Sequence, residues 1–233
     1  MVSAPPKSDL DRLLSPQIKN ERFYRAIRRV AASPAVRTVL EIGASSGGGS
    51  TEALVAGALA NPSGPPQLHS IEVSQARFGA LVQRYRDYPF VHPYNVSSVP
   101  SSAFPSEEQV ARFHREVRSK LRNNRLPKVL GWLRQDLAYL AEHPELNAAG
   151  IQRIREQNGL ARFDAVLIDG SEFTGEAELE EVYGAPFLLL DDTRTHKNWA
   201  NERRLRRDPA YRRVASSFWT RNGWAVFERV EAA

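Results

Sequence analysis

The chain contains no cysteine among its 233 residues. Without a thiol it forms no disulfide, no thiolate nucleophile, no cysteine-based zinc site and no iron–sulfur cluster. Its chemistry must therefore come from oxygen and nitrogen groups or from a bound cofactor.

Long apolar runs are also missing. No stretch approaches the roughly 18 consecutive apolar residues that a membrane-spanning helix needs, and the first residues, MVSAPPKSDLDRL, lack the apolar core of a secretory signal. The sequence therefore predicts a cytoplasmic protein with no membrane contact.

Lysine is scarce and arginine abundant, with 5 Lys and 27 Arg against 27 Asp plus Glu and a net charge of +5. Six arginines gather in ERRLRRDPAYRR: Arg203, Arg204, Arg206, Arg207, Arg212 and Arg213. Such a cluster could bind phosphate or nucleic acid. Because it has no interleaved aromatics beyond Tyr211 and no known binding module, we expect a solvated surface and consider nucleic acid an unlikely partner.

Short apolar runs alternate with segments of helical periodicity, which predicts an α/β protein with a doubly wound, mostly parallel sheet. The runs predicted as strands cover residues 37–42, 67–73, 90–96, 163–168 and 186–190, and the helices cover 17–32, 51–60 and 74–86. Residues 106–157 have helical spacing without strand patterns, so a helical insert or lid is expected at about 100–160.

The C-terminal region differs from this alternation. Residues 213–219 and 223–230 are two strand-like runs joined through Asn222-Gly223, a strong hairpin signal. We therefore expect seven strands that end in an antiparallel hairpin. Residues 1–34 are expected to form a leader and helix, and 35–233 one Rossmann-like domain.

A glycine-rich turn, GASSGGGS, follows the first predicted strand and precedes a helix. This arrangement gathers backbone N–H groups and a helix N-terminus at one edge of the sheet, where a ligand can bind. The turn is neither a Walker A loop nor a G-x-G-x-x-G motif. Glu41 before the turn suits a cationic amino group, and Glu72 at the end of the next strand suits a ribose diol.

Five pieces of the sequence together resemble the class I S-adenosylmethionine-dependent methyltransferases: LEIGASSGGG, HSIEV, FDAVLIDG, FLLLDD and the terminal hairpin. The resemblance implies that Glu72 binds the ribose hydroxyls and that Ser97, or alternatively Asn95, lies by the adenine. The other implied cofactor-binding residues are Glu41, Gly43, Ala44, Ser45, Gly47 and Asp169.

Acidic residues end two later strands, at Asp169 and at the pair Asp191-Asp192. Carboxyl ends of parallel strands meet at one edge, so these three carboxylates are expected to converge and to bind a hard cation such as Mg²⁺. The metal would hold a substrate hydroxyl and lower its pKa.

This acidic set resembles that of the metal-dependent O-methyltransferases of the catechol type, with two departures. Asp192 stands where that family has an Asn, and Glu172 stands near the position of the family's Lys base. His196 and Lys197, just after the acidic pair, are the alternative candidates for the base or for substrate contact, and Asp169 is a further catalytic candidate. The expected substrate is a hydroxyl of a small molecule such as a sugar or a phenolic metabolite, and a homodimer is a further possibility.

Two other functions fit parts of the sequence. GASSG matches the G-x-S-x-G nucleophile elbow, with Ser45, Asp191 and His196 in the order of an α/β-hydrolase. The elbow would follow the first strand rather than several, and no HGGG-like loop precedes it, which disfavours an esterase. The arginine cluster leaves open a methyltransferase that binds nucleic acid.

Overall fold

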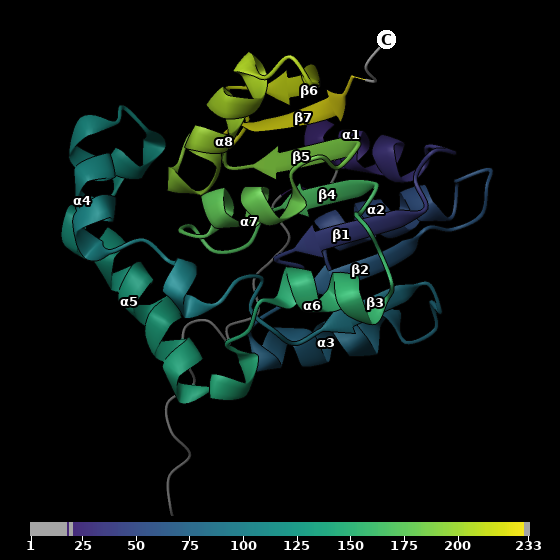
Figure 1. The fold of residues 1–233 in the computed structure, drawn as a ribbon, viewed down its shortest axis with the longest axis horizontal. Coiled ribbons are helices and arrows are strands. Elements are labelled where there is room, and N and C mark those ends of the chain that lie inside the picture. Colours follow the sequence, from purple (N-terminus) through teal and green to yellow (C-terminus); the bar gives the residue numbers. More distant parts are fainter. Residues whose placement is uncertain (1–17, 19–20, 231–233) are drawn as a thin grey trace, which may run out of the picture.

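The computed structural model describes residue 18 and residues 21–230, and its centre is a seven-stranded sheet in the order β3-β2-β1-β4-β5-β7-β6 (Figure 1). The strands are β1 Thr38–Ile42, β2 Gln67–Ile71, β3 Val91–Tyr94, β4 Ala165–Ile168, β5 Phe187–Asp191, β6 Tyr211–Ser217 and β7 Trp224–Arg229. All neighbouring pairs from β3 to β5 are parallel, whereas β7 runs antiparallel to both β5 and β6. The predicted fold class and the reversed C-terminal hairpin are confirmed.

Helices cover both faces of the sheet, which explains why the central strands are apolar throughout. One face packs against α1 Arg22–Ala31, α2 Ser50–Ala58 and α3 Gln75–Tyr85, and the other against α6 Gly150–Gln157, α7 Gly175–Val182 and α8 His196–Arg207. All four residues of β4 are buried. Each face has its own apolar core, as expected for a doubly wound fold.

The N-terminal part of the fold begins later than predicted. The expected helix at 17–32 is observed as α1 Arg22–Ala31, and most of the expected leader, residues 1–17 with 19 and 20, lies outside the described residues. Ser74 caps α3, because its side chain accepts a hydrogen bond from the Arg77 backbone N–H. Within the described part of the chain, no helix has the length and apolarity to cross a bilayer.

The expected helical insert is present as α4 Glu107–Glu116 and α5 Leu126–Glu142, which stand beyond the carboxyl ends of the parallel strands in Figure 1. Its core contains Val110, Val129 and Leu133. Helix α6 lies within the range expected for the insert, yet its Ile151 and Ile154 pack in the core on the sheet. The part that stands away from the sheet is therefore shorter than the range of about 100–160.

Helix α8 was not predicted, because its sequence HKNWANERRLRR has almost no apolar stripe. Leu205 is its one fully buried aliphatic side chain. The helix instead packs through polar groups: Asn198 Nδ2 donates to the backbone oxygens of Ile168 and Asp191, and Asn201 Nδ2 donates to that of Gly175. These bonds fix the start of α8 against the ends of β4 and β5.

Candidate functional site

A cavity of about 350 Å³ opens at the carboxyl ends of the parallel strands. This volume lies within the range of small-molecule sites. Its wall combines residues of the glycine turn, of the strand ends and of α5 from the insert. They include Gly43, Ala44, Ser45, Glu72, Ser97, Asp136, Tyr139, Asp169, Asp191, Asp192, Lys197 and Arg221. The candidate site therefore lies where open α/β sheets bind ligands.

The glycine turn is shaped by contacts within the chain. A Cβ on Gly43, at φ +89°, would lie 2.3 Å from the backbone oxygen of Asp169. A Cβ on Gly47, at φ +79°, would lie 2.5 Å from the Tyr85 ring. Packing within the chain therefore favours glycine at both positions, and Gly47 contacts Tyr85 and does not line the cavity.

Glu72 points its carboxylate at the glycine turn from the end of β2. Its Oε2 accepts from the Ser45 backbone N–H at 2.7 Å, and its Oε1 accepts from the Ser74 backbone N–H at 2.8 Å. The side chain lines the cavity and is held in one orientation. Glu72 therefore lines the cavity at the end of β2, and its binding of a ribose stays a prediction.

Glu41 does not reach the cavity, contrary to expectation. Its carboxylate is fully buried beneath the turn and accepts from Thr51 Oγ1, at 2.9 and 3.0 Å, and from Ser70 Oγ, at 2.9 Å. Burial raises the pKa of this carboxyl group. Glu41 joins β1 to α2 and β2, and the predicted ligand contact is wrong for this residue.

The two residues predicted near the adenine separate in the structure. Ser97 lines the cavity, with its hydroxyl donating to the Val99 backbone oxygen at 2.6 Å. Asn95 instead donates to the backbone oxygens of Glu72 and Val73 at 2.8 and 2.9 Å and is absent from the cavity wall. Asn95 shapes the strand end that carries Glu72.

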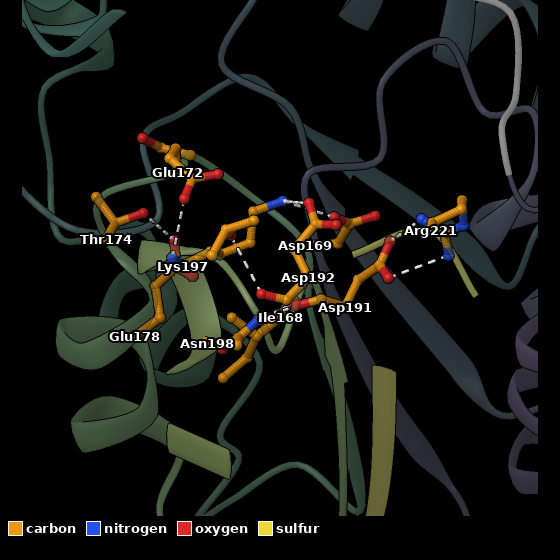
Figure 2. Close-up of polar contacts among 12 residues, drawn as sticks. Ile168, Asp169, Glu172, Thr174, Glu178, Asp191, Asp192, Lys197, Asn198 and Arg221 are labelled. Atoms are coloured by element: carbon orange, nitrogen blue, oxygen red, sulfur yellow. Dashed lines mark hydrogen bonds and ion pairs between the residues drawn. The ribbon is translucent and has the colours of Figure 1, made fainter. Parts of the chain in front are cut away.

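The three predicted aspartates converge, with one carboxylate oxygen from each of Asp169, Asp191 and Asp192 within 4.8 Å of the others. Two cations lie among them (Figure 2). Lys197 Nζ is 2.8 Å from Asp169 Oδ1 and 3.1 Å from Asp192 Oδ2. Arg221 donates to both oxygens of Asp191, at 2.8 and 3.0 Å.

These pairings do not fit a magnesium site. Each carboxylate that would bind the ion is already paired with a cation of the chain, and Asp191 uses both oxygens to bind Arg221. A divalent ion among the three acids would lie beside the Lys197 ammonium and be repelled by it. The residue set that the sequence suggested for Mg²⁺ is present, but Lys197 and Arg221 already bind its carboxylates.

Lys197 is a fixed cation rather than a base. Burial alone would lower its pKa, but the Asp169, Asp192 and Glu172 carboxylates raise it well above the ordinary value. Burial alone would likewise raise the pKa of Asp192, and the Lys197 ammonium holds it below its ordinary value. Lys197 is therefore protonated at neutral pH, which corrects its predicted role as proton acceptor.

His196 lies away from the cavity, although it neighbours Lys197 in the chain. Its ring centre is 4.7 Å from that of Phe113 and 5.8 Å from that of Phe173, between the insert and the sheet domain. Burial lowers its pKa to about 4. The prediction of His196 as a base is thus wrong, and the hydrolase triad fails because Ser45 lines the cavity while His196 does not.

Glu172 caps the helix that supplies Lys197. Its Oε1 accepts from the backbone N–H of His196 at 2.7 Å and from that of Lys197 at 3.3 Å. An acid at a helix N-terminus also complements the helix dipole. Where the catechol-type enzymes have a lysine, this chain has an acid that positions a lysine from another element.

Asp136 of α5 was missed by the sequence analysis. It lines the cavity, accepts from Ser171 Oγ at 2.6 Å, and has its pKa raised to about 6 by burial. Its spacing in the sequence could have identified Asp136, because it lies three residues after Leu133 and four before Leu140, both of which are buried. An acid on the apolar face of a helix indicates a polar site beneath it.

The arginine cluster lies on α8 and β6 and is largely paired with acids. Arg212 contacts Glu228 at 2.8 Å, Arg213 and Arg206 contact Glu202 at 3.0 and 3.7 Å, and Arg204 contacts Glu180. The Arg203 guanidinium stacks 3.6 Å from the centre of the Trp199 ring. This pairing matches the expected solvated surface.

Comparison with known proteins identifies the fold. No protein-family model matches the chain, and no curated protein matches it by sequence. Among solved structures, a methyltransferase from Geobacter sulfurreducens aligns with a TM-score of 0.51 at 11% identity, over 92% of this chain and 81% of that one. Cofactor-bound Rv0187 from MTB aligns with a TM-score of 0.52 at 16% identity, over 95% and 85%.

An O-methyltransferase from Bacillus cereus, solved in complex with SAH, aligns with a TM-score of 0.51 at 12% identity, over 98% of this chain and 94% of its own. At these identities the similarity establishes the architecture, not the reaction. The chain has the Rossmann-like fold of these methyltransferases, as its sequence motifs predicted.

Proposed function

We propose that the protein is an S-adenosylmethionine-dependent methyltransferase that acts on a hydroxyl group of a small molecule. One observation carries the proposal: the carboxylate of Glu72 is fixed by backbone N–H groups in a cavity that Asp136 and Lys197 also line. An acid for a ribose and a polar acceptor site thus share one cavity, on a fold whose solved examples include an O-methyltransferase.

The cofactor half of the cavity fits S-adenosylmethionine. The Glu72 carboxylate lines the cavity, and a carboxylate can accept hydrogen bonds from ribose hydroxyls. Asp169, at the end of β4, lines the cavity beside the glycine turn and can accept a hydrogen bond from the ammonium group of the methionine part. Ser97 remains the candidate for the adenine end.

The acceptor half of the cavity is formed by Lys197 of α8 and by residues of the insert, among them Asp136 of α5. When bound, the cofactor would supply an electrophilic methyl group to the acceptor oxygen, with the electron pair of the broken carbon–sulfur bond left on sulfur. Asp136 takes the proton of that hydroxyl, because a carboxyl group with a pKa of about 6 is mostly ionised at neutral pH. Tyr139 and Leu140 of α5 help to exclude water.

Calorimetric titration with S-adenosylhomocysteine tests the cofactor site. We expect wild-type protein to bind one equivalent and Glu72→Ala to bind at least about tenfold more weakly, equivalent to 1.4 kcal/mol. Glu108→Ala, which removes an exposed acid of the insert, is the matched control and should bind as wild type does. Thermal unfolding of each variant checks its fold, and absence of binding by the folded wild type would refute the proposal.

A further inference from the structure

We propose that the ammonium group of Lys197 is the permanent cation of the acceptor site, taking the place that a divalent metal has in metal-dependent enzymes, and that it binds a single acceptor oxygen. This inference rests on the proposed function. It starts from the position of Nζ, which lies 2.8 Å from Asp169 Oδ1 and 3.1 Å from Asp192 Oδ2, two of the three converging aspartates (Figure 2).

The donor capacity of Lys197 leaves room for a substrate. An ammonium group has three N–H bonds, and within the described part of the chain two of them are used, by Asp169 Oδ1 and Asp192 Oδ2. Lys197 also lines the cavity. The remaining N–H can therefore donate to the oxygen of a bound acceptor and stabilise negative charge that develops on it.

The lysine is held in place by its helix. Glu172 binds its backbone N–H, and the next residue, Asn198, donates to the backbone oxygens of Ile168 and Asp191 at 3.0 and 2.6 Å. A Cβ on Gly175 would lie 1.9 Å from the Lys197 backbone oxygen, so α7 and α8 are in close contact here. The backbone from which the Lys197 side chain extends is therefore fixed at this packed junction.

The charges around the site are consistent with a built-in monovalent cation. Arg221 neutralises Asp191 through two hydrogen bonds, and Lys197 neutralises the other two aspartates in part. A metal-binding acidic cluster would instead leave its carboxylates available to the ion. The chain thus contains both the acids and the cations that balance them.

A lysine in place of a metal ion also changes the class of acceptor molecule that the site can bind. A metal ion can bind two neighbouring oxygens of one substrate, as a vicinal diol presents, because it has several open coordination positions. One available N–H of Lys197 binds one oxygen. We therefore infer that the acceptor is methylated at a single hydroxyl that needs no chelating neighbour.

Titration with Mn²⁺, followed by electron paramagnetic resonance and calorimetry, tests the inference without any substrate. We expect no binding by wild-type protein up to about 1 mM, the weak limit of protein sites for divalent cations. Lys197→Met should open the three aspartates and bind Mn²⁺ at least about tenfold more tightly than wild type. Lys128→Met, which removes an exposed lysine, controls for net charge, and Lys197→Arg should remain unable to bind.

Stoichiometric binding of Mn²⁺ by wild-type protein, lost in Asp192→Asn, would overturn the inference. If Lys197→Met does not fold, the wild-type and Lys197→Arg titrations decide it: no binding supports it and binding refutes it. A parallel titration with S-adenosylhomocysteine, with and without EDTA, tests the proposed function separately. We expect equal affinity in both, and loss of affinity in EDTA would contradict the built-in cation while leaving the cofactor site supported.

Discussion

The guanidinium group of Arg221 donates to both carboxylate oxygens of Asp191, at 2.8 and 3.0 Å. Arg221 belongs to the turn between β6 and β7, whereas Asp191 ends β5. The pair is largely shielded from water, with side-chain exposures of 17% and 4%. It therefore fixes the reversed C-terminal hairpin to the edge of the sheet at which the cavity opens.

Removing this arginine should destabilise the fold strongly, because it leaves the Asp191 carboxylate buried without its partner. We expect Arg221→Met to lower the free energy of unfolding by about 3 kcal/mol, measured by urea denaturation. Combining it with Asp191→Asn should recover part of the loss, since no unpaired charge then remains. If the two single losses simply add in the double variant, the two side chains are not energetically coupled.

The glycine turn offers a matched pair of positions for a second prediction. Gly43 and Gly64 share a φ of +89°, but a Cβ on Gly43 would collide with the backbone of Asp169 while one on Gly64 would meet nothing within 4 Å. Gly64→Ala should cost about 1 kcal/mol through backbone strain alone. Gly43→Ala should cost about 2 kcal/mol more, so equal losses in urea denaturation would contradict the close packing of the turn on β4.

The sequence was sufficient to predict the architecture because buried parallel strands and turn residues leave strong local signals. The run AVLI of β4 and the Asn222-Gly223 turn required no knowledge of distant contacts. Helix α8 left no such signal, since it is held by asparagine side chains and by Leu205. Periodicity of apolar residues detects helices that pack through apolar faces and misses one that packs through hydrogen bonds.

The candidate site was predictable only where its residues end strands. Glu72, Asp169, Asp191 and Asp192 were found because carboxyl ends of parallel strands share one edge. Their partners come from other elements: the Arg221 turn, helix α8 and helix α5. Which cation pairs with which acid depends on tertiary contacts, so the sequence suggested a metal where the structure has Lys197.

Asp136 provides a test that depends on pH. Its pKa is raised by burial from an ordinary value of 3.8 to about 6, so the folded protein holds this proton more tightly than the unfolded chain does. The resulting stabilisation is complete below pH 4 and is lost as the pH rises through 6. Between pH 5 and pH 8 the wild type should lose about 1 kcal/mol of unfolding free energy through this group.

The unfolding free energy of Asp136→Asn should not fall in this way between pH 5 and pH 8, because an amide does not titrate. Urea denaturation of both proteins at pH 5 and pH 8 should show the variant gaining about 1 kcal/mol relative to the wild type. With an acceptor substrate in hand, the same variant should lower kcat about 100-fold as expected for loss of a general base, while S-adenosylhomocysteine affinity stays unchanged. If the variant has the same unfolding free energy as the wild type at both pH values and the same kcat, Asp136 neither titrates with a raised pKa nor acts as the general base.

His196 should show the opposite pH dependence. Burial lowers its pKa from 6.5 to about 4, so the unfolded chain binds a proton that the folded protein rejects. Its contribution to stability is present above pH 6.5 and is lost as the pH falls toward 4, by about 2 kcal/mol between pH 7.5 and pH 5. His196→Leu, which keeps an apolar side chain against Phe113 and Phe173, should remove that loss. His69, whose pKa is also lowered to about 4, is unchanged in the variant and contributes equally to both proteins.

Urea denaturation of the wild type and of His196→Leu at the two pH values measures this difference in stability. Binding of S-adenosylhomocysteine should be the same in both proteins, because the His196 ring lies outside the cavity. If a stably folded His196→Leu variant binds S-adenosylhomocysteine more weakly than the wild type, His196 belongs to the ligand site after all.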